Sequence, residues 1–208
     1  DLIESYKSLD EALRHGAIDN QVQLKMTYID AEDLESGKLD QIKECDGLLV
    51  PGGFGQRGTE GKIQAIKFAR ENNIPFFGIC LGMQLAMVEF ARNMAGIKNA
   101  TSMEFDKGGD FVIHYMEGQT KEGSKGGSMR LGAYDCRLEK DSLVSKIYGS
   151  ENISERHRHR LEVNNEFVPK LKKAGMIISG VNDKLNLVEV IELKEHPYFI
   201  ACQYHPEF

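Results

Sequence analysis

Short apolar runs and amphipathic segments alternate along the first hundred residues. Apolar runs at residues 47–50 and 75–79 predict buried strands, and the segments at 60–71 and 83–94 predict helices. Residues 21–30 alternate apolar and polar side chains, which predicts a further, half-buried strand. Strands that alternate with helices in this way are typical of a parallel sheet covered by helices on both faces.

The second half of the chain has a different pattern. Three apolar runs separated by turns, at residues 176–181, 187–193 and 198–204, predict strands that pair with their neighbours. We therefore expect an α/β fold with a mainly parallel central sheet flanked by helices and an antiparallel section added on one side. Because 208 residues suffice for one domain with a substantial core, residues 1–208 are expected to form a single domain.

Composition narrows the class of protein. The net charge of −6 argues against a general nucleic-acid binder, although the basic run 156–160 taken alone is typical of a solvated basic face or an RNA-binding patch. The four cysteines form neither a Cys-x-x-Cys pair nor a His/Cys metal spacing, so we expect reduced thiols, no metal and a cytoplasmic protein. The chain starts at Asp1 without methionine and stops at Phe208 directly after a motif, so we expect it to be part of a longer chain.

Cys80 lies at the junction between the predicted strand 75–79 and the helix that follows it. Gly78 and Gly82 flank it, and Gly-x-Cys-x-Gly at such a junction matches a nucleophile elbow with sulfur in place of oxygen. A chain that turns this sharply passes so close to itself that side chains at the glycine positions would clash. The helix N-terminus is expected to favour the thiolate. A lone cysteine is more often a buried apolar residue, but the two flanking glycines and the strand–helix junction favour a nucleophile here.

A thiol nucleophile needs a base and a group that orients the base. His205 and Glu207 follow the last predicted strand, and a carboxylate beside an imidazole can orient the ring and fix its tautomer. The glycine-rich loop 51–58 can present bare N–H groups to an oxyanion, although a phosphate cradle or a plain turn is also compatible with it. Since the carboxyl ends of parallel strands meet at one edge of a sheet, this loop and Cys80 are expected there together.

Five stretches together resemble a known family. Gly78-Ile-Cys-Leu-Gly-Met-Gln84 and His205-Pro-Glu207 resemble the class I, triad-type glutamine amidotransferases. Residues 51–58, 126–132 and 156–164 resemble, more narrowly, the glutaminase domains of the CTP synthase family. The resemblance implies the flavodoxin-like fold of the class I amidotransferases.

The resemblance also implies a glutaminase. In this role Cys80 attacks the side-chain amide of glutamine, His205 transfers the proton and Glu207 orients His205, so that glutamate and ammonia leave by way of a thioester. The N–H groups of Gly53 and Leu81 are implied to hold the oxyanion. The residues implied to bind glutamine are Gly53, Leu81, Gly82, Met83, Gln84, Glu104 and Arg160.

In this family a separate synthetase domain uses the ammonia and ATP to aminate UTP to CTP. We therefore expect no cofactor in this chain, and ATP, Mg and the activator GTP in the full-length enzyme, a homo-oligomeric ligase of pyrimidine biosynthesis. The expected partners are glutamine and the synthetase domain, with no nucleic acid and no membrane. Two alternatives stay open: the glutaminase domain of another amidotransferase, and a catalytically silent regulatory module of the same fold. The intact triad argues against the silent module.

Overall fold

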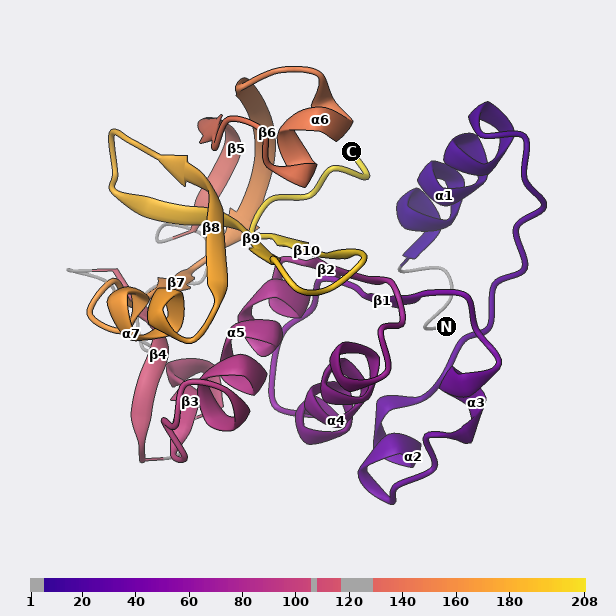
Figure 1. Ribbon diagram of the computed structural model, residues 1–208, viewed down its shortest axis with the longest axis horizontal. Helices are drawn as coiled ribbons and strands as arrows, with labels where there is room; N and C mark the ends of the chain where they lie inside the picture. Colours follow the sequence, from indigo (N-terminus) through magenta and orange to yellow (C-terminus); the bar gives the residue numbers. More distant parts are fainter. Residues whose placement is uncertain (1–5, 106–107, 117–128) are drawn as a thin grey trace.

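A computed structural model of the chain describes residues 6–105, 108–116 and 129–208. Two sheets and the helices around them make up this part of the chain (Figure 1). The strands of the large sheet are, in spatial order, β1 (Leu48–Val50), β2 (Phe76–Ile79), β10 (Phe199–Cys202), β9 (Leu187–Leu193), β8 (Met176–Asn182), β5 (Arg130–Leu138) and β6 (Asn152–His159). The strands of the small sheet are β3 (Ala100–Ser102), β4 (Asp110–Tyr115) and β7 (Leu161–Val163).

The helices lie on both faces of the large sheet and beside its edge (Figure 1). They are α1 (Lys7–Asp19), α2 (Ala31–Glu35), α3 (Asp40–Lys43), α4 (Thr59–Glu71), α5 (Leu81–Asn93), α6 (Leu143–Tyr148) and α7 (Val168–Lys173), with a 3-10 turn, η2, at Met103–Phe105. Within the described residues, none of these helices has the length and apolar character that crossing a membrane requires.

The direction of the strands changes across the large sheet. β1, β2 and β10 run parallel, and from β10 onward the pairings with β9, β8, β5 and β6 are antiparallel. The predicted α/β class and the added antiparallel section are thus confirmed. The parallel section is smaller than predicted, because four of the six pairings that the structure describes in this sheet are antiparallel.

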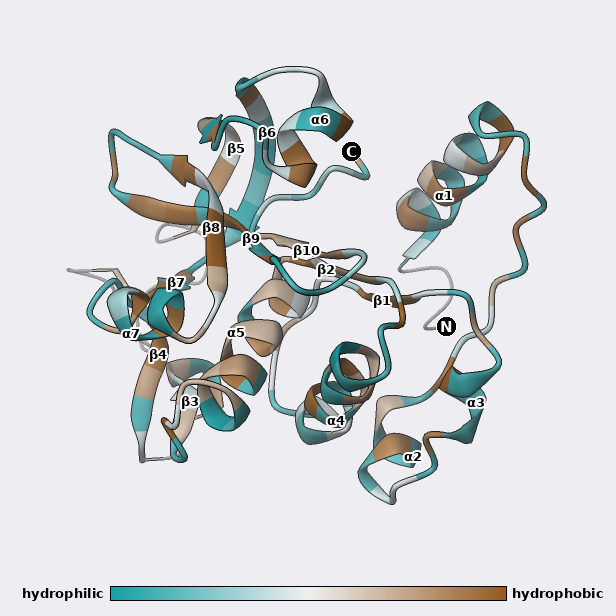
Figure 2. Cartoon of the chain, viewed as in Figure 1, coloured by the Kyte–Doolittle hydropathy of each residue, from teal (hydrophilic) through white to brown (hydrophobic). Residues whose placement is uncertain are grey.

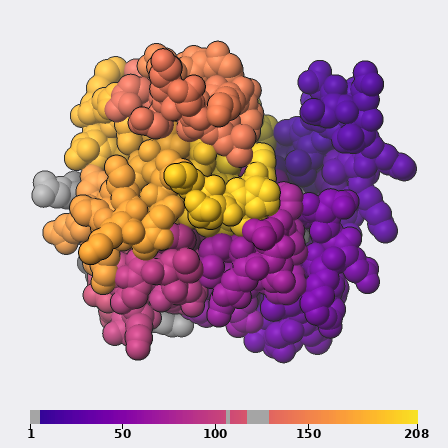
Figure 3. Space-filling view, in the orientation of Figure 1, coloured from indigo at the N-terminus to yellow at the C-terminus, as the bar shows by residue number. Residues whose placement is uncertain are grey.

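The predicted strand at residues 21–30 is wrong. These residues pair with no strand in the described part of the chain, so β1 is an edge of the large sheet there. Val22 and Tyr28 are 62% and 52% exposed, which means that the alternation of apolar and polar residues does not mark a buried face. The preceding helix α1 buries no side chain completely and projects from the body of the molecule (Figure 3).

The alternation of side chains along β10 divides the core into two clusters. Phe199 and Ala201 join the larger cluster around α5, whereas Ile200 and Cys202 join a second cluster on the opposite face of the sheet. Apolar residues accordingly follow one another without interruption along β10 (Figure 2), whereas Glu189 and Glu192 interrupt the apolar residues of the neighbouring strand β9. A strand covered on both faces in this way reads as a continuous apolar run, which is why the sequence predicted it well.

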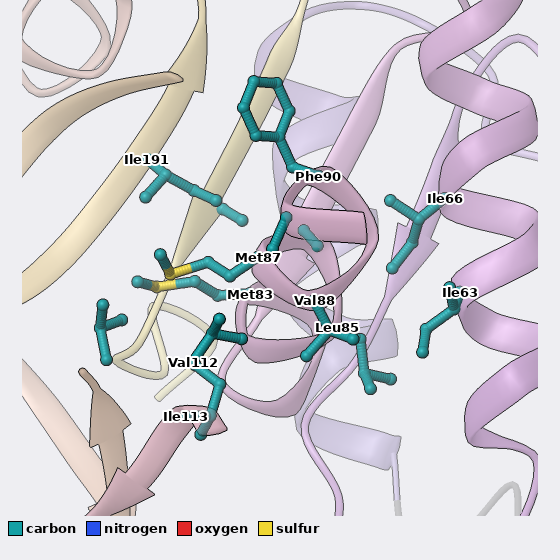
Figure 4. Close-up of a cluster of buried hydrophobic side chains, with 14 of the residues drawn as sticks. Ile63, Ile66, Met83, Leu85, Met87, Val88, Phe90, Val112, Ile113 and Ile191 are labelled. Carbon is teal, nitrogen blue, oxygen red and sulfur yellow. The ribbon is translucent and has the colours of Figure 1, made fainter. Parts of the chain in front are cut away.

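Helix α5 is the centre of the larger cluster. All residues from Leu81 to Ala91 are buried, because the helix lies between the large sheet, α4 and the small sheet. Figure 4 shows Met87 on the side of α5 that faces Ile191 of β9, with Ile66 of α4 on the other side. Apolar residues on every side of a helix are typical of such an enclosed position, and the buried carboxylate of Glu89 is paired with Arg70 at 2.8 Å.

Candidate active site

The turn between β2 and α5 gives Cys80 an unusual backbone conformation. Its φ of 52° and ψ of −102° lie in a region that residues other than glycine rarely adopt. The N–H of Cys80 donates to the carbonyl oxygen of Cys202 at 2.7 Å, which anchors the turn to the end of the neighbouring strand β10. A strained residue held by its surroundings in this way is characteristic of functional sites.

The two glycines beside Cys80 have the steric role that the sequence predicted. A Cβ atom at Gly82 would overlap the carbonyl oxygen of Val50 at the end of β1. A Cβ atom at Gly78 would lie 2.9 Å from both the carbonyl carbon of Gly82 and the Cβ of Ala201. The expectation that the chain passes too close to itself for side chains is therefore confirmed at both positions.

Replacing Gly82 by alanine should destabilise the chain strongly. The added methyl group meets backbone rather than a movable side chain, so we expect a loss of about 3 kcal/mol in the free energy of unfolding. Gly16 provides the matched control, because a Cβ atom there meets nothing within 4 Å and the residue lies inside α1. Gly16→Ala should stabilise by about 0.5–1 kcal/mol. Urea unfolding of both variants measures the difference, and a similar effect of the two substitutions would contradict this account of the turn.

His205 and Glu207 form the pair expected of a base and its orienting group. Nδ1 of His205 lies 2.8 Å from Oε1 of Glu207, and the two side chains are only 12% and 10% exposed. The pair is directed towards Cys80: a Cβ atom on Gly52 would lie 2.8 Å from Cε1 of His205 and 3.5 Å from Cβ of Cys80. With Nδ1 occupied by the carboxylate, Nε2 is the ring nitrogen left for proton transfer.

A small cavity lies in front of Cys80. The residues that line it are Gly53, Phe54, Cys80, Leu81, Gln84, Glu104, His159, Arg160 and Leu161. Six of the residues singled out in the sequence thus meet at one cavity, from segments far apart in the chain. Oε1 of Glu104 accepts a hydrogen bond of 2.8 Å from the N–H of Gly55, which joins η2 to the glycine loop. The Nε of Arg160 is buried and has no hydrogen-bond partner among the described residues.

Three of the predicted glutamine-binding residues have other roles in packing. The side chain of Met83 is completely buried in the core cluster around α5 (Figure 4), and Gly82 is pressed against β1. The side-chain amide of Gln84 is engaged: its Nε2 donates to the carbonyl oxygen of Leu161 at 3.1 Å and to Oε1 of Gln203 at 3.0 Å. Their contacts with glutamine remain predictions, which for Gly82 and Met83 concern the backbone.

Sequence reasoning missed several residues at this site. His159 and Phe54 line the cavity, and Gly52 leaves the space that the imidazole of His205 occupies. The glycine loop and the basic run indicated these segments. Alternation along a strand shows only that every second residue of the basic run shares a face, and it does not show which face is buried. Residues 126–128 of the stretch 126–132 lie outside the described residues.

Comparison with known proteins identifies the family. The family model described as Glutamine amidotransferase class-I matches residues 1–208. The chain belongs to the class-I glutamine amidotransferase family. The glutaminase domain of CTPS from Trypanosoma brucei, a structure with bound acivicin, is 42% identical and superposes with a TM-score of 0.93 over 100% of this chain and 82% of that one. This amidotransferase is therefore of the CTP synthase glutaminase type.

Two further matches show how much of each protein is similar to this chain and how much each similarity supports. A CTP synthase of Pelobacter propionicus is 54% identical over 209 residues, which cover 100% of this chain and 39% of that protein. The amidotransferase chain thus spans about two fifths of the length of the curated relatives it matches. A glutamine amidotransferase of Thermotoga maritima is 14% identical with a TM-score of 0.55, over 94% of this chain and 69% of that one, and shows the fold alone.

Burial controls the ionisation of the Cys80 thiol. It raises the pKa of the Cys80 thiol to about 12, and the carboxylates of Glu207 and Glu162 act in the same direction. The N–H of Leu81 and the side-chain amide of Gln203 lower this pKa, but they do not offset burial. The helix N-terminus therefore acts as the sequence suggested but is too weak to produce a thiolate. A base must take the proton.

The wall of the cavity behind His159 contains a buried ionic cluster. Arg130 donates to Glu162 at 3.0 Å and to Glu189 at 2.7 Å, and all three side chains are at most 5% exposed. Each carboxylate also binds a histidine of β6: Glu162 lies 2.7 Å from His159 and Glu189 lies 2.8 Å from His157. Burial lowers the pKa of His159, which disfavours its charged form. The guanidinium of Arg130 therefore supplies the positive charge between the two carboxylates.

This cluster corrects the view of residues 156–160 as a solvated basic face. Arg156 and Arg158 are exposed, as that view requires, but the histidines between them point inward, as alternation along a strand dictates. The run therefore has two different faces. Its outer face is solvated, and the histidines of its inner face bind Glu162 and Glu189 and so hold the end of β6, next to which Arg160 lines the cavity.

Arg130→Ala should cost more stability than any exposed ion pair. The substitution leaves two buried carboxylates without their shared cation, so we expect a loss of about 3 kcal/mol and a melting temperature lower by about 6–12 °C. Arg137→Ala is the matched control on the same strand, because its pair with Asp183 is about half exposed and contributes little. Calorimetry compares the two, and equal melting temperatures would show that the cluster is dispensable.

Proposed function

We propose that the chain hydrolyses glutamine to glutamate and ammonia through a thioester on Cys80. The observation that carries this proposal is the cavity itself, which has the strained Cys80 at its base, Glu104 and Arg160 on its walls and the His205–Glu207 pair beside it. A nucleophile, an oriented base and two opposite charges converge there, which is what cleavage of an amide in a zwitterion needs.

Acylation begins with transfer of the Cys80 proton to Nε2 of His205, and the sulfur then attacks the amide carbon of glutamine. The N–H groups of Gly53 and Leu81 stabilise the oxyanion that develops on the carbonyl oxygen. His205, held by Glu207, returns the proton to the amide nitrogen, the C–N bond breaks and ammonia leaves. In deacylation His205 takes a proton from water, the hydroxide attacks the thioester, and glutamate and the thiol are released.

Recognition of glutamine uses the charges on the cavity wall. Arg160 binds the α-carboxylate through its guanidinium, whose buried Nε lacks a protein partner among the described residues. Glu104 binds the α-ammonium, with Oε2 available because Oε1 accepts from Gly55. Gln84 contributes through its Oε1, since both hydrogens of its Nε2 are directed to protein oxygens.

We assign this domain to a longer protein in which the ammonia aminates UTP to CTP with hydrolysis of ATP. We propose that this protein is a cytoplasmic homo-oligomer that uses Mg and is activated by GTP. The length of the curated relatives, of which the chain spans about two fifths, supports a separate synthetase domain. The alternatives are a glutaminase domain that serves another amidotransferase and a silent regulatory module.

The experiment follows the amide nitrogen in the full-length protein. With [amide-15N]glutamine, UTP, ATP, Mg and GTP, we expect 15N in the exocyclic amino group of CTP and glutamate in equal amount, both measured by mass spectrometry. Glutamate and labelled ammonia without labelled CTP would point to another synthetase, and the absence of glutamate would point to a silent module.

A further inference from the structure

Two buried amide side chains connect the cavity wall to the nucleophile. Gln203 follows β10 and is completely buried, and Gln84 on α5 is 5% exposed. Nε2 of Gln203 lies 3.6 Å from Sγ of Cys80, within hydrogen-bond distance for sulfur. Oε1 of Gln203 accepts from Nε2 of Gln84 at 3.0 Å, and the same Nε2 donates to the carbonyl oxygen of Leu161 at 3.1 Å.

The carbonyl oxygen of Leu161 fixes the direction of every bond in this chain of amides. A carbonyl oxygen can only accept, so Gln84 must turn its NH2 group towards Leu161. The second hydrogen of that NH2 group then requires an oxygen on Gln203, which leaves the NH2 group of Gln203 facing Cys80. The orientation of Gln203 as a donor to sulfur thus follows from a backbone group on β7.

The backbone on both sides holds the donor and the acceptor in place. The N–H of Gln203 donates to the carbonyl oxygen of Glu189 on β9 at 2.8 Å, and the N–H of Cys80 donates to Cys202, the residue next to Gln203. A donor held within reach of the sulfur need not reorganise when charge develops there. Hydrogen bonds to an ionised partner are about twice as strong as neutral ones.

We propose that Gln203 is a catalytic residue whose side-chain N–H donates to Sγ of Cys80 and stabilises the thiolate in attack and release, with Gln84 as the residue that positions it. This inference rests on the proposed glutaminase function. It adds a donor to the sulfur that is separate from the two N–H groups on the oxyanion and from the proton transfer by His205.

Gln203→Met tests the proposal, because methionine keeps the approximate length and shape of the side chain and removes the donor. The first measurement is the alkylation of Cys80 by iodoacetamide as a function of pH, which does not depend on glutamine binding. The titratable groups that face Cys80 are His205, Glu207, Glu162 and Cys202, and all of them are unchanged in the variant. We expect alkylation about tenfold slower at each pH below the thiol pKa, and kcat for glutamine about tenfold to a hundredfold lower with KM unchanged.

Gln41→Met on α3 is the matched control, since Gln41 is exposed and should leave both rates unchanged. An unchanged alkylation profile in Gln203→Met, or a raised KM with kcat unchanged, would overturn the proposal. If the unaltered chain releases no glutamate, the proposed function fails while the alkylation profile still decides the role of Gln203.

A measurement on the unaltered chain covers the case in which Gln203→Met does not fold. The side-chain NH2 resonances of Gln203, assigned by selective 15N labelling, should move when Cys80 is alkylated, because the acceptor changes from a thiol to a thioether. The NH2 resonances of Gln41 should stay where they are. Unmoved Gln203 resonances would overturn the proposed bond.

Discussion

Cys80→Ala abolishes glutamine hydrolysis: we expect kcat to fall by roughly 10⁴-fold or more, to the background of the assay. Among the described residues that line the cavity, Cys80 is the only one that can form the thioester, and the oxyanion donors cannot act without an attacking atom. Glutamate release measured with an enzyme-coupled assay gives the rate. The melting temperature should change little, because alanine fits the space of a buried thiol.

Cys45→Ala is the control for Cys80→Ala, because this thiol is partly exposed and follows α3, away from the cavity. It should leave kcat within a factor of two. Under the proposed function, Cys80→Ala in the full-length protein should retain CTP synthesis from free ammonia, since only the supply of ammonia from glutamine is lost. Glutamine hydrolysis by Cys80→Ala within tenfold of the unaltered chain would refute the thioester route.

His205→Ala should have the second largest effect, a loss of about 10³–10⁴-fold in kcat, whereas Glu207→Gln should cost about tenfold to a hundredfold. Removing the imidazole eliminates proton transfer, but a glutamine at 207 can still hold the ring near its position. Measured kcat values for the two variants give the comparison, and equal losses would contradict the separate roles of base and orienting group.

The pH dependence of the His205→Ala variant provides a further check. Because burial raises the pKa of the Cys80 thiol to about 12, its thiolate fraction grows about tenfold per pH unit throughout the range below that value. Alkylation of Cys80 in the variant should therefore rise up to pH 10 without a plateau. A plateau near neutral pH in the variant would show that another group ionises the thiol.

The sequence predicted the turn at Cys80 because its physical cause is local. Two glycines two residues on either side of the cysteine, at a change from strand to helix, have one steric explanation, and Val50 and Ala201 confirm it. The sequence analysis joined His205 to Cys80 through the need for a base and the family resemblance, whereas it assigned residues 198–204 to the antiparallel section. In the structure β10 runs parallel to β2 as its direct neighbour, which brings the two residues to one edge of the sheet. The family resemblance supplied Glu104 and Arg160, for which the chain gives no local signal.

Long-range burial could not be predicted in the same way. Residues 21–30 show an alternation of apolar and polar side chains that is typical of a strand. No described strand lies beside them, so their apolar side chains do not form a buried face. The histidines of the basic run are buried only because Glu162 and Glu189, on two other strands, supply carboxylates for them. The direction of the Gln203 side chain could not be predicted either, because it depends on Gln84, more than a hundred residues away.

The most direct test of the account is the intact mass of the chain after incubation with 6-diazo-5-oxo-norleucine, a glutamine analogue that alkylates nucleophiles, with and without excess glutamine. We predict a single adduct, located on Cys80 by peptide mapping and prevented by glutamine, because the nucleophile and the glutamine site share one cavity. An adduct on another cysteine, an adduct on Cys80 that glutamine does not prevent, or no adduct in the presence of the synthetase domain and GTP would contradict the central claim.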